Sequence, residues 1–162
     1  MWPETNFTPV HSTLPDALAR LADHIATLPV TLAALSEQEL TEHQPGKWSK
    51  KQVIGHLIDS ARYNLERFTE AQCMPEPYRV GSYRQNELVV VNQYQTVPTS
   101  HLLMLWQNLN QQILYVAQNL TVQEIDRRLT YIDNPTVPFT LSWLIQDYVG
   151  HLEHHLKTLY SQ

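Results

Sequence analysis

His151 and His155 are the side chains of this 162-residue chain whose type and spacing point most directly to chemistry. In a helix, residues four positions apart lie on one face, so two imidazole nitrogens there converge on one metal ion. At about 100° per residue, His155 lies about 40° and His151 about 80° from the centre of the apolar stripe that Leu141 and Leu159 define, whereas His154 points away from it. The pair therefore indicates a metal site or, alternatively, a core histidine with satisfied hydrogen bonds beside a boundary residue.

A third ligand from another part of the chain would favour the metal site, and His56 is the candidate. It lies within the segment Val53–Ser60, which reads VIGHLIDS. His56 falls off the apolar stripe of this segment and on a second face, so it would reach the interior only if the helix were buried on more than one side. The spacing alone leaves that question open.

Other catalytic motifs are missing from the sequence. In the zinc-protease motif His-Glu-x-x-His the glutamate follows the first ligand, whereas here Glu153 is displaced by one position and points off the histidine face. There is no Gly-x-Ser-x-Gly elbow, no Gly-rich phosphate loop and no dinucleotide fingerprint. The single cysteine, Cys73, excludes a disulfide framework and a multi-cysteine zinc site within one chain, and we interpret it as a bystander.

The composition describes a folded domain that does not bind nucleic acid. With 43% hydrophobic and 17% charged residues, the chain is not intrinsically disordered, and its length suits one domain. A net charge of −5 argues against binding DNA or RNA. No apolar run approaches the roughly 18 residues of a membrane span, and Met1–Glu4 lacks the features of a signal peptide. We therefore expect a soluble protein of a reducing compartment, the cytoplasm.

Apolar spacing of four and three predicts four long helices joined by three long connections. The first starts after a Thr13 cap and continues, kinked, across Pro29; the second opens with the capping box Ser49–Gln52 and ends before Pro75. The third follows Pro98, and the fourth covers about residues 140–160. The connections are 36–48, 73–98 and 121–139, the last beginning with a capping box at Thr121. Strand evidence is confined to Leu88–Val91, and an all-α four-helix bundle is the default architecture.

Two stretches together resemble the DinB/YfiT-like family. Gly46–Ser49 followed by Val53–Ser60 resembles its Trp-Ser/Thr…Gly-His-Leu signature, and Tyr148–Leu156 resembles its C-terminal His-x-x-x-His helix. The resemblance covers nearly the whole chain. It implies a single domain over residues 1–162, a four-helix bundle of up-down-down-up topology and a homodimer. It also implies a divalent metal ion on three histidines, which by position are His56, His151 and His155.

The resemblance further implies an enzyme that acts on a small molecule, because relatives are described as metal-dependent hydrolases and some branches as transferases or isomerases that use low-molecular-weight thiols. The metal would be nickel, zinc or iron, no catalytic residue is assigned, and Asp59 and Glu153 are candidates for orienting the ligands. We expect metal affinity to fall below the ordinary histidine pKa of about 6.5. The alternative is a non-catalytic, stress-associated dimeric bundle whose metal is structural or absent.

Overall fold

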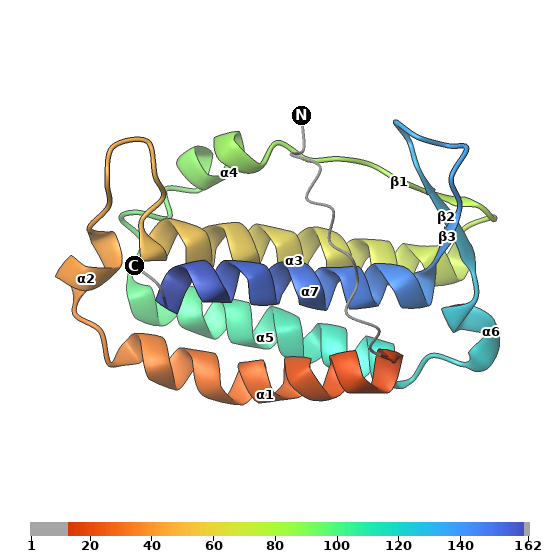
Figure 1. The fold of residues 1–162 in the computed structure, drawn as a ribbon, viewed down its shortest axis with the longest axis horizontal. Helices are drawn as coiled ribbons and strands as arrows, with labels where there is room; N and C mark the ends of the chain where they lie inside the picture. Colours follow the sequence, from red (N-terminus) through yellow and green to blue (C-terminus); the bar gives the residue numbers. More distant parts are fainter. Residues whose placement is uncertain (1–12, 161–162) are drawn as a thin grey trace.

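Four long helices form the body of the protein, and the computed structural model describes them within residues 13–160. They are α1 (Leu14–Ala33), α3 (Lys50–Cys73), α5 (Thr99–Gln118) and α7 (Leu141–Tyr160). Helices α1 and α7 run in one direction and α3 and α5 in the other (Figure 1), while α1 and α3 each pack against both α5 and α7. This arrangement is the predicted all-α up-down-down-up bundle. The N-terminal segment on which the signal-peptide prediction falls lies outside the described residues.

The predicted helix starts are present as capping boxes. In each, a hydroxyl accepts from a backbone N–H three residues on, and the side chain of that residue accepts from the cap backbone: Thr13 does this for α1, Ser49 for α3 and Thr121 for the short α6 (Val122–Ile125). Helix α1 continues through Pro29, so the first apolar segment is one helix, as its register predicts. A further capping box at Ser36 opens α2 (Glu37–Thr41), which the sequence analysis did not include.

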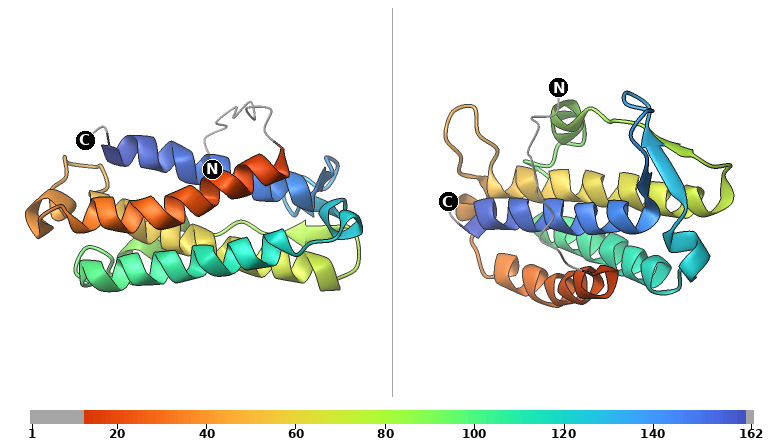
Figure 2. Two further views of the ribbon diagram at one scale, coloured as in Figure 1. Left: turned by 90° about the horizontal axis from the view of Figure 1, so that it is seen from below. Right: turned by 45° about the vertical axis from the view of Figure 1, so that its right-hand side comes forward.

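Helix α3 is covered on more than one side. Its residues 53–61 are all buried, and the connection that contains α4 (Gln85–Val91) runs along the outer side of α3 (Figures 1 and 2). After α4 the chain buries Tyr94 against Gly55, and the Tyr94 hydroxyl donates to Asp59 Oδ1 at 2.9 Å. The second face of α3, whose burial the sequence left open, is therefore an inner face.

A small sheet closes the end of the bundle where α3 ends and α7 begins (Figure 1). Strands β1 (Tyr78–Val80) and β2 (Arg128–Tyr131) pair in parallel, and β2 pairs antiparallel with β3 (Phe139–Thr140). The sequence pattern does not predict this sheet, and the one segment with strand-like character, Leu88–Val91, is helical in α4. The reason is that β1 and β2 are far apart in sequence, and a pairing between two long loops leaves no local pattern. Among the described helices none is long and apolar enough to cross a membrane.

Two glycines should respond in opposite ways to replacement by alanine. A Cβ at Gly55 would collide with the ring of Tyr94, so Gly55→Ala should lower the free energy of unfolding by about 1–3 kcal/mol through overpacking. At Gly150, in α7, a Cβ would meet no heavy atom of the described residues within 4 Å. Gly150→Ala should therefore raise stability by about 0.5–1 kcal/mol through helix propensity. Urea denaturation of both variants measures the difference, and equal stabilisation by both would contradict the packing of Tyr94 on α3.

Candidate metal centre

Three histidine side chains meet between α3 and α7. Nε2 of His56 lies 3.4 Å from Nε2 of His151, which in turn lies 3.1 Å from Nε2 of His155. His56 is fully buried, and the other two are partly buried. Within residues 13–160 this is the one group of three or more His, Cys, Asp or Glu side chains placed to share an ion, with ligand atoms all within 4.8 Å of one another.

The helices explain the convergence. His151 and His155 are one turn apart on α7, so their rings project side by side. His56 comes from the antiparallel α3 and points inward, because α3 is buried over the whole span 53–61. The rings pack edge to face, with centroids 5.2 Å apart for His56 and His151 and 4.6 Å apart for His56 and His155. The structure thus brings together the three residues that the family resemblance implied.

The spacing of the nitrogens fits a shared ion. Imidazole nitrogens lie about 2.0–2.1 Å from zinc in a tetrahedral site, so two such ligands are about 3.3 Å apart. The observed separations of 3.1 and 3.4 Å bracket that value. One ion accepts lone pairs from all three nitrogens at once, whereas a neutral imidazole has a single N–H to share with its neighbours. The donor set therefore fits a divalent metal ion.

The electrostatics keep the rings neutral. Burial, followed by the nearby charge of His155, lowers the pKa of His56 to about 3. Burial and the other histidines lower the pKa of His151 to about 3, and burial and His154 lower that of His155 to about 4. Neutral imidazoles keep the lone pairs that a metal needs. In the folded chain burial lowers the pKa of the ligands below the ordinary histidine value of about 6.5, so the expected fall in metal affinity moves to more acidic pH.

The side chains beside the three histidines are not the ones that the sequence predicted to orient them. Asp59 does not contact the three rings through any hydrogen bond of the described residues; it instead accepts from Tyr94 and Asn92 and pairs with Arg62 at 3.5 Å. Ser60, which the sequence analysis gave no role, lies one turn after His56 with its Oγ 3.5 Å from Nδ1 of His151. Its position one helical turn after His56 is the feature of the sequence that could have predicted this proximity.

Away from the other two histidines, the His56 ring is held by packing and not by a hydrogen bond of the described residues. The Trp48 ring lies 5.1 Å from the His56 ring, centroid to centroid. Nδ1 of His56 is buried without a hydrogen-bond partner among the described residues. The packing of this ring therefore comes from aromatic contact and from the burial of α3, while its Nε2 side faces the other two histidines.

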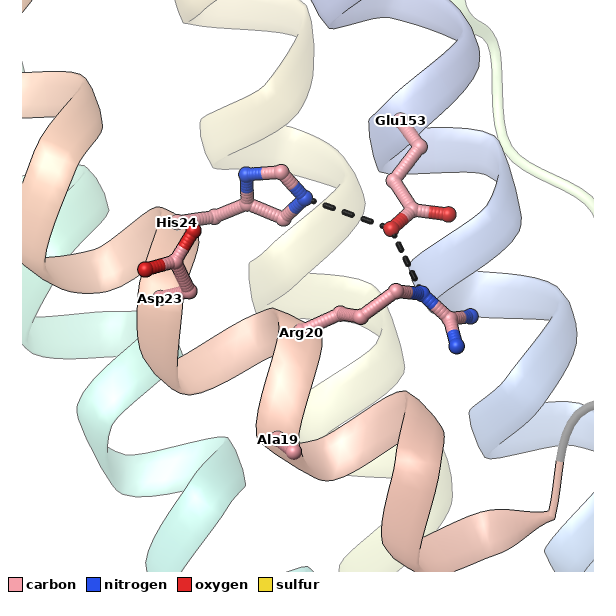
Figure 3. A pocket seen from close by; sticks show the side chains of 5 residues that line it. All are labelled: Ala19, Arg20, Asp23, His24 and Glu153. Carbon is pink, nitrogen blue, oxygen red and sulfur yellow. Dashed lines mark hydrogen bonds and ion pairs between the residues drawn. The ribbon is translucent and has the colours of Figure 1, made fainter.

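Glu153 also has a different role from the one expected. Its Oε1 accepts from Nε of Arg20 at 2.8 Å and lies 3.3 Å from Nε2 of His24, both on α1 (Figure 3). These residues, with Ala19 and Asp23, line an open pocket of about 400 Å³ that contains none of the three clustered histidines. Glu153 therefore joins α7 to α1. His154 is exposed, as predicted, and Cys73 is exposed at the end of α3.

The comparisons with known proteins agree with this fold. The chain matches the DinB superfamily over residues 12–159 and therefore belongs to it. It is 31% identical over 137 residues to the protein named "Putative metal-dependent hydrolase BH0277" of Halalkalibacterium halodurans, covering 82% of this chain and 78% of that protein.

Two solved structures share the fold. YfiT from Bacillus subtilis, described as "a probable metal-dependent hydrolase with an unusual four-helix bundle topology", superposes with a TM-score of 0.82 at 23% identity, over 91% of this chain and 84% of that one. The mycothiol-dependent maleylpyruvate isomerase superposes with a TM-score of 0.63 at 14% identity. That match covers 90% of this chain and 60% of the isomerase.

Acid should destabilise the metal-free protein through these histidines. The unfolded chain binds protons at histidine near pH 6.5, whereas the folded cluster does so only near pH 3–4, so between these values the unfolded state holds more protons. Stability is then lost as pH falls from about 6.5 towards 4, by up to about 1.4 kcal/mol per pH unit for each proton.

Urea denaturation of chelator-treated protein between pH 4.5 and 7.5 should show a shallower pH dependence of the free energy of unfolding for His151→Gln than for wild type. The control His101→Gln, at an exposed position of α5, should keep the wild-type slope. Identical slopes for wild type and His151→Gln would contradict the burial of neutral imidazole.

Proposed function

We propose that this protein is a metal-dependent enzyme acting on a small molecule, with one divalent ion held by His56, His151 and His155. The observation that carries the proposal is the convergence of three neutral Nε2 atoms at 3.1 and 3.4 Å between two helices. Their all-imidazole chemistry suits zinc, nickel or iron.

The number of ligands favours catalysis over a structural metal. Within the described residues the cluster contains three donors and no fourth histidine, cysteine or carboxylate. Structural zinc sites use four protein ligands, whereas catalytic sites use three and keep a position open. A divalent ion supplies a Lewis acid there and lowers the pKa of a coordinated water to about 7. The chain itself contributes the neutral ligands and the hydroxyl of Ser60 beside His151.

Hydrolysis is the reaction class that we favour, and thiol-dependent group transfer is the second. The relative from Halalkalibacterium halodurans carries the name of a metal-dependent hydrolase, which supports the first. The fold shared with an isomerase that depends on mycothiol supports the second, in which the substrate is a low-molecular-weight thiol. The non-catalytic, stress-associated bundle has no comparable observation in its favour.

Removing the ligands should remove the metal. Protein purified without a histidine tag and loaded with zinc, nickel or iron should hold one equivalent per chain after dialysis. His155→Ala should lose stoichiometric binding, because two imidazoles remain where three are needed. His154→Ala and His101→Ala, at exposed positions, should retain it. Elemental analysis measures the result, and one retained equivalent in the variant lacking His56, His151 and His155 would refute the site.

We infer that the single domain forms a homodimer and that it acts in the cytoplasm, where a lone exposed thiol such as Cys73 stays reduced. The prediction of a dimer rests on the family resemblance. Light scattering at high concentration should give a particle of twice the 18.8 kDa chain mass. A particle of 18.8 kDa under the same conditions would exclude the dimer.

A further inference from the structure

Two charged side chains, Arg67 and Asp147, also lie on the α3/α7 seam that holds the three neutral histidines. Arg67 follows His56 by eleven residues on α3, which at 3.6 residues per turn returns to within about 20° of the same direction. Asp147 precedes His151 by one turn on α7, about 6 Å along the axis. Because α3 and α7 are antiparallel (Figure 1), both displacements lead towards the small sheet. Asp147 therefore lies one turn from the histidines along the seam, and Arg67 lies about 16 Å along it, both on the side of the small sheet.

The sheet fixes Arg67 in place. Nη2 of its guanidinium donates to the carbonyl oxygen of Gly81, directly after β1, and Nη1 donates to Oδ1 of Asn64 at 3.3 Å. The guanidinium carbon lies 5.6 Å from the centroid of the Tyr83 ring. These two hydrogen bonds use two of the five N–H donors. Within residues 13–160 no ion pair to Arg67 is present, so its charge has no direct counter-charge and three of its N–H donors lie outside these two bonds.

Asp147 faces this charge without a direct partner. Its carboxyl is partly buried, and burial raises its pKa while the charge of Arg67 opposes that shift. Burial, followed by the Asp147 charge, raises the pKa of Tyr131, at the end of β2, to about 12. Across residues 13–160 no group donates a hydrogen bond to Asp147 or forms an ion pair with it. A partly buried carboxyl without a donor is costly, so this position suits a ligand that brings one.

We propose that Arg67 and Asp147 form a distal subsite for the end of the substrate that is remote from the three histidines. The substrate end that fits is a carboxylate with an adjacent amino or hydroxyl group. A bare carboxylate on Arg67 would be repelled by Asp147, and a bare amine on Asp147 would be repelled by Arg67. A group carrying both matches the two charges together. This subsite rests on the proposed function, in which the histidine cluster holds the reacting end.

Four hydroxamates with the same metal-binding head and the same chain length test the subsite. L-glutamate γ-hydroxamate carries both an amine and a carboxylate, glutarate monohydroxamate carries only the carboxylate, 4-aminobutyrohydroxamate carries only the amine, and pentanohydroxamate carries neither. Calorimetry measures their binding to the zinc-loaded protein, whose zinc content is established first by elemental analysis. Wild type should bind L-glutamate γ-hydroxamate tightest.

Each variant should affect only the probes that carry the matching group. Arg67→Gln should weaken the two carboxylate probes by about tenfold or more, the effect of losing a charge-assisted hydrogen bond, and leave pentanohydroxamate unchanged. Asp147→Asn should weaken L-glutamate γ-hydroxamate and 4-aminobutyrohydroxamate by a similar factor. The control Arg79→Gln removes an exposed arginine of β1 and should change none of the four affinities.

Two results would overturn the subsite: equal binding of all four probes by wild type, or an equal effect of each variant on all four, as a merely structural role would give. If the protein takes up no zinc, the proposed function fails instead. The subsite can then be tested by titrating metal-free protein with L-glutamate and following the backbone amide chemical shifts by NMR. Saturable binding that Arg67→Gln and Asp147→Asn weaken supports the subsite, and its absence refutes it.

Discussion

The structure depends on burying three neutral imidazoles against one another where α3 crosses α7. Their nitrogens lie 3.1 and 3.4 Å apart, too close for more than one of them to be charged, and burial keeps their pKa values near 3 to 4. Buried polar atoms without full hydrogen bonding cost about 1–3 kcal/mol each. A divalent ion would offset that cost by accepting all three lone pairs, which couples metal binding to the stability of the bundle.

The connections of the chain hold this crossing together as much as the helices do. The segment after α4 packs Tyr94 onto Gly55 and bonds it to Asp59, which covers the outer side of α3 and keeps His56 on an inner face. At the other end, the small sheet ends beside the seam, where the carbonyl of Gly81 accepts from Arg67. The long loops are therefore the parts of the fold that shape both ends of the candidate active site.

The sequence predicts the helices well because periodicity and caps are local: Thr13, Ser49 and Thr121 all cap as expected. It also predicts the pairing of His151 and His155, since four residues make one helical turn. It could not place His56 by spacing, because the burial of that face depends on a segment almost forty residues away. The same reason explains the missed sheet and the roles of Asp59 and Glu153, whose partners Tyr94 and Arg20 are distant in sequence.

X-ray absorption spectroscopy of the metal-loaded protein tests the ligation by three histidines, because it counts the ligands around the ion. A site formed by His56, His151 and His155 should give about three imidazole nitrogens at about 2.0–2.1 Å, with one further light atom. His56→Ala leaves two imidazoles where three are needed, so after dialysis it should hold too little metal to give this spectrum. A spectrum with sulfur in the first coordination sphere, or an imidazole count that His56→Ala leaves unchanged, would contradict this ligation.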